Sequence, residues 1–216
     1  GTTRWHADLE RALAGWFAAP CAIVYPSGYL ANLGVLGTLL APGDAVFIDR
    51  LVHASLVDAA RASRATLKVF HHNDPAHLAQ LLSRARTCRR RLVVTEGVFS
   101  MDGDVALLKE LVEAAEAHDA LGYLDDAHGA FVLGEQGRGT PEACGISHER
   151  LIYMGTLGKA LGCQGGFVIG PTALIEWLHH RSRPFIYSTA LAVPVAAAAV
   201  EALRLLQDAA DHRTRL

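Results

Sequence analysis

Residues 92–124, LVVTEGVFSMDGDVALLKELVEAAEAHDALGYL, contain two short apolar runs on either side of a longer segment. The runs Leu92–Thr95 and Leu121–Leu124 have the length and composition of buried strands. Between them, over about 105–118, apolar residues recur at the three- and four-residue spacing of an amphipathic helix, namely Leu107, Leu108, Leu111, Val112 and Ala115. A strand, a helix and a second strand in this order predict one βαβ unit of a parallel sheet.

The same alternation extends along the rest of the chain. The other strand candidates are Ala22–Tyr25, Ala45–Ile48, Thr66–Phe70, Leu151–Met154 and Gly166–Ile169. The other segments with helical spacing are about 8–18, 28–40, 53–63, 75–86, 171–181 and 193–216. We therefore predict an α/β fold with a mostly parallel central sheet and helices on both faces.

Composition excludes several classes of protein. The chain has 216 residues, of which 51% are hydrophobic and 19% charged, and its net charge is −2, so nothing indicates nucleic-acid binding. Its four cysteines are widely spaced, as expected for a reduced cytoplasmic protein. The most apolar stretch, Ala190–Val200, is too short and too polar at its end to span a bilayer. We expect a single domain covering residues 1–216, which is part of a longer protein because a helical pattern starts almost at once and the last one ends without a cap.

Polar residues gather directly after four of the predicted strands. These groups are Ser27–Tyr29, Glu96–Ser100, Asp125–His128 and Thr156–Lys159. In open α/β sheets, ligands bind in the crevice beyond the carboxyl ends of the strands. Four separate segments therefore predict one ligand site at this edge of the sheet.

Lys159 is one of only three lysines, against seventeen arginines, and it lies in the glycine-rich stretch 155–162. A lysine amine can form a Schiff base, which an arginine guanidinium cannot. The flanking glycines leave room for a large planar group beside the backbone. Taken alone, the segment is equally compatible with a solvated loop lysine.

The group after Leu121–Leu124 offers two further functional side chains. Asp125 could hold a protonated heterocyclic nitrogen, and His128 could reach a phenolic oxygen next to it. The sequence is equally compatible with a purely structural role, in which Asp125 or Asp126 only caps the following turn.

Ser27, Gly28 and Tyr29 lie between a predicted strand and a predicted helix, where backbone N–H groups beside a small hydroxyl can bind a phosphate. Taken alone, this segment is more typical of an ordinary serine N-cap. Thr156 offers a second hydroxyl close to the lysine. His53, at the start of another predicted helix, could stack on a planar cofactor or be a partly buried helix-terminal histidine.

Particular residues exclude other kinds of functional site. The pairs 71–72 and 179–180 lack a second histidine or a cysteine at the spacing of a metal cage, so we interpret them as surface histidines and expect no metal. A P-loop is excluded because Tyr153 and Ala160 stand where it requires glycine and serine or threonine. Ser100 lacks the flanking glycines of a nucleophile elbow.

A reactive lysine, a carboxylate, a stacking histidine and a phosphate cradle together describe a site for pyridoxal 5'-phosphate (PLP). The chain also resembles the α-oxoamine synthases, a family of fold-type I PLP enzymes, along nearly its whole length. The segments that carry the resemblance are Pro26–Asn32, Arg50–Leu56, Thr95–Asp104, Asp125–Gly129, Gly134–Gly139, Thr156–Lys159 and Tyr187–Thr189. The resemblance implies that residues 1–216 are the large PLP-binding domain, without the family's N-terminal arm and small C-terminal domain.

The resemblance also implies a role for each matching residue. Lys159 would carry PLP covalently, Asp125 would pair with the pyridine nitrogen, and His128 would contact the ring oxygen. His53 would stack on the ring and face the amino acid. These four would be the catalytic residues, and the remaining cofactor contacts would come from Gly28, Tyr29, Ser100, Thr156 and Thr189, the last of them reaching the phosphate of a neighbouring subunit.

Within the family, the chain most resembles the members that condense L-alanine with a pimeloyl thioester of CoA or a carrier protein, with loss of CO2. It resembles almost as well the members that transfer an acetyl group from acetyl-CoA to glycine. A third alternative is a catalytically silent partner subunit, but such a subunit has no chemical need for Lys159. The resemblance implies a homodimer with shared sites.

Overall fold

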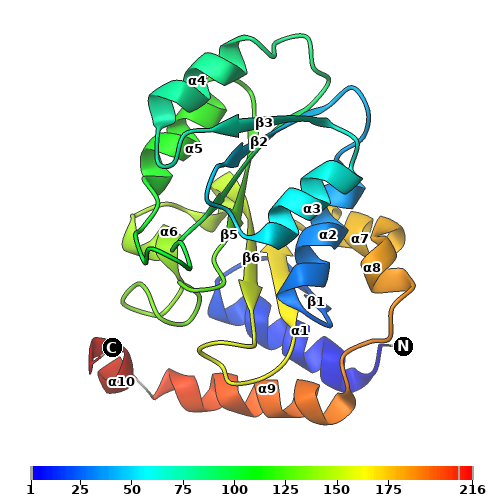
Figure 1. The fold of residues 1–216 in the computed structure, drawn as a ribbon. Helices are drawn as coiled ribbons and strands as arrows, with labels where there is room; N and C mark the ends of the chain where they lie inside the picture. Colours follow the sequence, from blue (N-terminus) through cyan, green and yellow to red (C-terminus); the bar gives the residue numbers. More distant parts are fainter. Residues whose placement is uncertain (1, 209, 216) are drawn as a thin grey trace.

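In the computed structural model, which describes residues 2–208 and 210–215, the chain folds around one seven-stranded sheet (Figure 1). The strand order is β1-β7-β6-β5-β4-β2-β3. All seven predicted strands are confirmed, as β1 (Cys21–Tyr25), β2 (Ala45–Asp49), β3 (Thr66–Phe70), β4 (Arg91–Glu96), β5 (Leu121–Asp125), β6 (Leu151–Thr156) and β7 (Gly166–Gly170). Only β7 runs against its neighbours, so the sheet is mostly parallel, as predicted.

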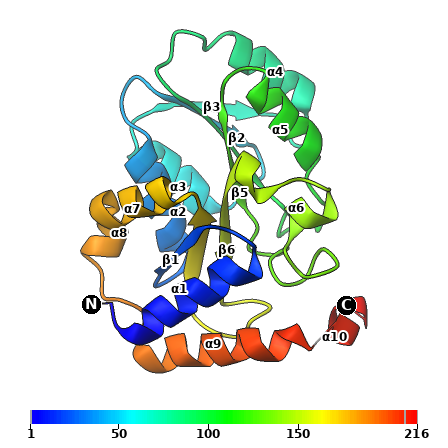
Figure 2. The same ribbon diagram turned by 180° about the vertical axis from the view of Figure 1, so that it is seen from behind.

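Helices cover both faces of this sheet, also as predicted (Figures 1 and 2). One group is α2 (Gly28–Leu39), α3 (Ala54–Ala62), α7 (Thr172–Arg181) and α8 (Arg183–Ile186). The opposite side carries α4 (Pro75–Ser83), α5 (Leu108–Glu116) and α6 (Thr140–Ala143). The helices α1 (Arg4–Trp16) and α9 (Val193–Gln207) pack against each other beside β1, and α10 (Ala210–Arg215) follows them. A 3-10 turn, His148–Arg150, precedes β6.

The prediction of one continuous helix over 193–216 is wrong. The helix α9 ends at Gln207, and α10 begins after residue 209, which lies with residue 216 outside the described ranges. Arg213 of α10 donates a hydrogen bond to the Leu206 carbonyl at the end of α9 (3.2 Å) and another to the Glu135 carbonyl (3.3 Å). The break therefore lets one side chain satisfy a terminal helix carbonyl and reach a distant loop, which helical periodicity does not reveal.

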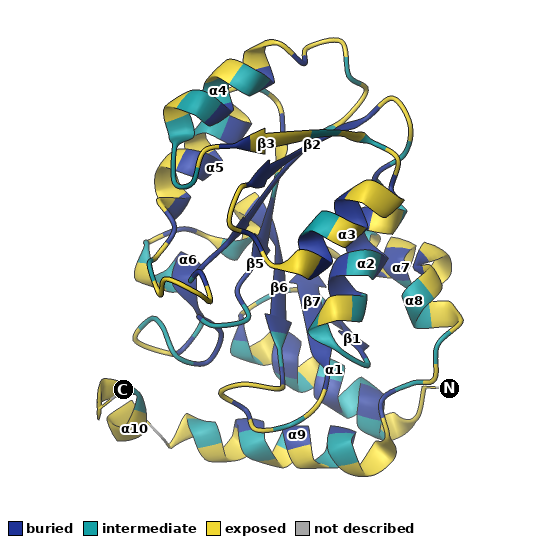
Figure 3. Ribbon diagram, in the orientation of Figure 1, coloured by how far each residue is buried: buried dark blue, intermediate teal, exposed yellow. Residues whose placement is uncertain are grey.

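The side chains of the sheet explain the layer arrangement. Every residue of β2 and of β7 is buried, as is expected for strands covered on both faces (Figure 3). Edge strand β3 instead exposes Thr66, Lys68 and Val69. A lysine on an exposed edge strand is a common way to discourage pairing with another chain.

Strand register brings the predicted polar groups together. Glu96 pairs with Asp125, and Asp125 pairs with Met154, so the carboxyl ends of β4, β5 and β6 lie side by side. Gly166 on β7 allows the start of α2 to approach the same edge, because a Cβ there would collide with the backbone of Gly28. The N-terminus of α2 is thus held over the ends of the central strands.

Among the described residues, none of the helices combines the length and the apolar character that crossing a membrane requires.

Candidate active site

A cavity lies beyond the carboxyl ends of β4, β5 and β6. Its volume is about 160 Å³, and it is partly open to solvent. Seven of the residues singled out from the sequence line it: Gly28, Tyr29, His53, Asp125, His128, Thr156 and Lys159. The ligand site expected at this edge of the sheet is therefore present as a real cavity.

Asp125, the last residue of β5, is the buried carboxylate of the cavity, with 5% of its surface exposed. Its Oδ2 accepts a hydrogen bond from Asn32 Nδ2 (2.8 Å), and its Oδ1 accepts one from the Ala127 amide (3.1 Å). Burial raises the pKa of Asp125, while these hydrogen bonds and the nearby positive charge of Lys159 oppose the increase. Asp125 thus caps the following turn and also lines the cavity, while its predicted pairing with a heterocyclic nitrogen stays a prediction.

Asp126 has only the structural role. It is fully buried and accepts hydrogen bonds from the Thr140 amide (2.8 Å), the Thr140 hydroxyl (2.6 Å) and the Tyr153 hydroxyl (3.0 Å). Burial raises its pKa to about 6 in spite of these donors. Asp126 therefore joins α6 to β6 behind the cavity.

Asn32, on α2, organises the cavity floor, and its role was missed in the sequence. Its Nδ2 donates to Asp125 and also to Ser55 Oγ (2.8 Å), while its Oδ1 accepts from the Tyr123 hydroxyl (2.6 Å). Ser55 Oγ in turn lies 2.7 Å from His53 Nδ1. With both amide hydrogens of Asn32 used, the serine hydroxyl is free to donate to the histidine, so one buried network orients both Asp125 and His53.

His53 is the N-cap residue of α3 and stands exposed at the mouth of the cavity. Its Nδ1 accepts a hydrogen bond from the Ser55 amide (3.2 Å), which leaves the proton of a neutral ring on Nε2. His53 therefore lies at a helix terminus, as one prediction had it, and its ring is still accessible to a planar ligand. His128 lies half-buried on the turn after β5, and burial lowers its pKa.

Glu96, the last residue of β4, belongs to the predicted polar group Glu96–Ser100, but the sequence predicted no role for it. Only 3% of its surface is exposed, and its Oε1 accepts a short hydrogen bond from the His53 amide. Burial raises the pKa of Glu96 to about 7; Asp125 raises it further, while the His53 amide and Lys159 lower it. A carboxyl that changes charge near neutral pH therefore stands beside Asp125 and holds the backbone of His53.

The start of α2 forms one wall of the cavity. Ser27 Oγ accepts from the Leu30 amide (3.1 Å), so Ser27 is the N-cap that the segment favoured. The amides of Gly28 and Tyr29 precede the first hydrogen bonds within the helix and have no helical acceptor, which suits an anion. The Tyr29 ring points elsewhere, since its hydroxyl donates to Asp58 Oδ2 (2.6 Å). Only the backbone of Tyr29 is thus suited to the predicted contact.

Thr156 and Lys159 also line the cavity, with Thr156 next to Gly28. The Thr156 hydroxyl donates to the Gly165 carbonyl (2.9 Å) and accepts from the Gly158 amide (3.2 Å), which ties down the loop that carries the lysine. Lys159 itself is exposed and its side chain lines the cavity. The rare lysine thus lines the same cavity as the buried carboxylate.

Two predicted cofactor contacts lie outside this cavity. Ser100 is exposed on the loop after β4, and Thr189 is exposed on the segment after α8. The cofactor contacts of Ser100 and Thr189 therefore remain predictions. The contact of Thr189 would also require a neighbouring subunit.

The interpretation of the 71–72 pair as two surface histidines is wrong for His72. Its Nδ1 lies 3.0 Å from Asp49 Oδ1 and its Nε2 lies 2.7 Å from Asp104 Oδ2, with 22% of the side chain exposed. The ring thus joins the end of β2 to the loop before α5. Sequence spacing concealed this role because the two carboxylates are 23 and 32 residues away.

The chain belongs to the aminotransferase class I and II family, which it matches over residues 1–216. Among curated proteins, it is 48% identical over 215 residues to the 8-amino-7-oxononanoate synthase of Methylobacillus flagellatus, a match that covers 100% of this chain and 54% of that protein. The chain thus spans about half the length of the curated relatives it matches. The predicted resemblance to α-oxoamine synthases is confirmed.

Solved structures confirm the predicted fold of a PLP-transferase large domain. A serine palmitoyltransferase of S. paucimobilis, solved with a PLP–myriocin aldimine, superposes with a TM-score of 0.96 at 36% identity, covering 100% of this chain and 54% of that one. The 8-amino-7-oxononanoate synthase of Francisella tularensis gives a TM-score of 0.86 at 33% identity, covering 100% and 62%.

Proposed function

We propose that the chain is the PLP-binding part of an enzyme that condenses L-alanine with a pimeloyl thioester, with loss of CO2, to give 8-amino-7-oxononanoate. The observation that carries the proposal is the cavity, in which Lys159 and the buried Asp125 face one space at the ends of the central strands. The similarity to 8-amino-7-oxononanoate synthases over the whole chain supports this choice of reaction.

The residues present fit the cofactor. The amides of Gly28 and Tyr29 offer donors to a phosphate, and Gly28, which has no side chain, lies beside Thr156. A buried carboxylate such as Asp125 needs a positive partner, which a protonated pyridine nitrogen supplies. Among the described residues that line the cavity, Lys159 is the only lysine.

Bound PLP supplies an electron sink for a carbanion on the amino acid. The Lys159 amine would hold the cofactor and, once released by the amino acid, would remove the proton from its α-carbon. Asp125, held by Asn32, would keep a proton on the pyridine nitrogen. His53, fixed by Ser55, would cover one side of the cavity and keep water away from the reacting carbon.

We further propose a cytoplasmic homodimer in which Thr189 reaches the partner's site. The exposed side chains around α8 support an interface there, since Ile186 and Tyr187 have 42% and 73% of their surface exposed. Sedimentation of the full-length protein should give twice the monomer mass, and a monomer that binds PLP with undiminished affinity would refute the shared site.

The full-length protein tests the reaction directly. It should show a visible absorbance band with PLP, and it should release thiol from pimeloyl-CoA when L-alanine is added. The Lys159→Ala variant should lose both the band and the thiol release. If the wild-type protein binds PLP but only glycine with acetyl-CoA releases thiol, the proposed substrates are wrong; if the variant retains the band and turnover, the role of Lys159 is wrong.

A further inference from the structure

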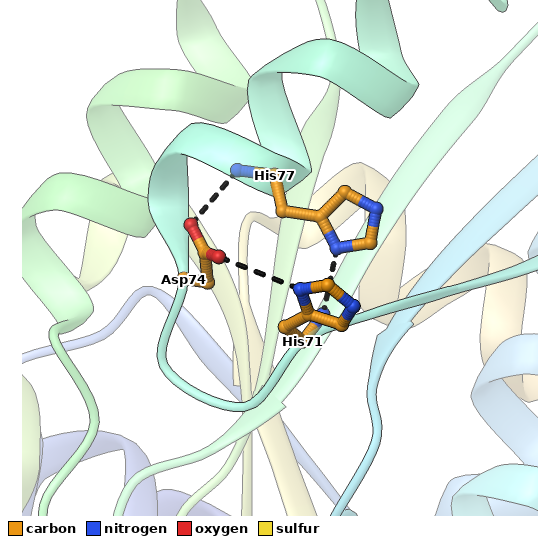
Figure 4. Close-up of side chains that lie close together, drawn as sticks. All are labelled: His71, Asp74 and His77. Atoms are coloured by element: carbon orange, nitrogen blue, oxygen red, sulfur yellow. Dashed lines mark hydrogen bonds and ion pairs between the residues drawn. The ribbon is translucent and has the colours of Figure 1, made fainter.

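Three side chains with metal-binding atoms meet where β3 passes into α4, away from the cavity lining. One ligand atom each from His71, Asp74 and His77 lies within 4.8 Å of those of the other two (Figure 4). The spacing of the paired histidines 71 and 72 did not reveal this group, because the second metal-binding histidine lies six residues after the first.

The backbone holds the three positions in place. The Asp74 amide donates to the His71 carbonyl (3.2 Å), and Asn73 between them has a left-handed conformation (φ 49°). Asn73 is fixed in turn by its amide to Asp49 Oδ2 (2.9 Å) and by its Nδ2 to Asp104 Oδ2 (2.9 Å). The turn is therefore anchored to the sheet, and an ion would not have to order a loose loop.

Three side-chain atoms can serve as ligands of an ion, and one of them already accepts a backbone hydrogen bond (Figure 4). Asp74 caps α4 through Oδ1, which accepts from the His77 amide (2.9 Å), so Oδ2 is left and lies 3.6 Å from His71 Nδ1. His77 Nδ1 accepts from the His71 amide (3.0 Å) and therefore carries a lone pair and no proton when neutral. The two imidazole rings are tilted by 42° relative to each other, with centroids 4.0 Å apart.

A small rearrangement would suffice for coordination. Nitrogen and oxygen ligands lie about 2.1 Å from Zn²⁺, which places tetrahedral ligand atoms about 3.4 Å apart. The ligand atoms of the cluster already lie within 4.8 Å of one another, and the His71 side chain is 68% exposed. The ion would replace the His71 amide as the partner of His77 Nδ1.

We propose that His71, Asp74 and His77 bind a divalent transition-metal ion, of which Zn²⁺ fits best. Two imidazole nitrogens and one carboxylate are zinc-type ligands, whereas Mg²⁺ and Ca²⁺ prefer oxygen ligands. Because the site is exposed, a water molecule would occupy the fourth position of the tetrahedral coordination. The site is independent of the reaction proposed above and would tie the end of β3 to the start of α4.

Titration of chelator-treated full-length protein with Zn²⁺, and with Co²⁺ followed by its visible absorbance, tests the proposal. The wild type should bind one ion with an affinity that excess Mg²⁺ does not reduce. His71→Gln and His77→Gln should each weaken that binding at least tenfold. Asp74→Asn should weaken it as well while keeping the helix cap, because asparagine is as good an N-cap as aspartate.

His180→Gln is the matched control, since His180 is an exposed histidine on α7 outside the cluster. It should leave the affinity unchanged. The proposal is overturned if the wild type shows no saturable binding of one ion, or if the affinity survives in both histidine variants of the cluster.

Discussion

Replacing Glu96 by Gln should make the protein's stability less dependent on pH. Glu96 is buried between the His53 amide and Asp125, and these surroundings raise its pKa from 4.5 to about 7, with burial as the main cause. Glutamine has the same shape and can still accept the hydrogen bond from His53 through its amide oxygen. It does not titrate, so the variant separates the charge of Glu96 from its hydrogen bond.

The sign and size of the effect follow from proton linkage. Between its unfolded and folded pKa values, Glu96 binds more protons in the folded than in the unfolded protein, so wild-type stability falls as pH rises from 4.5 to about 7. The difference between these two pKa values corresponds to a decrease of at most about 3 kcal/mol in the free energy of unfolding. Because the carboxyl lines a cavity that admits water, we expect about 2 kcal/mol.

Denaturant unfolding of the PLP-free protein at pH 5 and pH 8 measures this contribution. The stability of Glu96→Gln relative to wild type should rise by about 2 kcal/mol between the two pH values and remain level above pH 8. Glu113→Gln, at an exposed position on α5, should show no such change. A difference between Glu96→Gln and wild type that is constant or falls with pH would refute the reasoning.

Further substitutions test the packing around the cavity. Gly97→Ala should destabilise the protein by roughly 2–4 kcal/mol in thermal or denaturant unfolding, because its Cβ would collide with the Asp126 carboxylate. Gly15→Ala, in α1 where a Cβ meets nothing within 4 Å, should instead stabilise it by about 0.5–1 kcal/mol, and equal effects at both glycines would contradict the structure. Tyr123→Phe should cost about 1–3 kcal/mol and weaken PLP binding, because Asn32 loses the 2.6 Å hydrogen bond from the tyrosine hydroxyl; unchanged stability would show that this network is not needed.

The strands were predictable because each is a short apolar run that is recognisable without its neighbours. Thr66–Phe70 has the predicted bounds, and the other strands differ from prediction by one or two residues at an end. The helices α6 and α8 were missed because each has only four residues, too few for a periodic pattern. The end of α9 at Gln207 was not predicted. The helix that follows makes a hydrogen bond from Arg213 to Glu135, 78 residues away in the sequence, and local periodicity does not reveal such a contact.

The site was predictable only in part. Lys159 and Asp125 could be found because each lies at or just after the carboxyl end of a strand, where ligands bind in open α/β sheets. Asn32 could not, because an asparagine within a helix has no local signal, and its value comes from hydrogen bonds to Asp125 and Tyr123. Glu96 was recognised only as one of a polar group, since its unusual pKa arises from burial beside Asp125.

The sequence alone determined the order of strands and helices along the chain, the edge of the sheet where the cavity lies, and the lysine and the carboxylate that line it. These features are local, since they depend on periodicity and on the residues directly after each strand. The tertiary structure alone decided how the site is held together, through contacts between residues 93 apart for Asn32 and Asp125 and 43 apart for Glu96 and His53. Burial and hydrogen bonding between distant segments set the charge and orientation of these groups, and no local pattern encodes them.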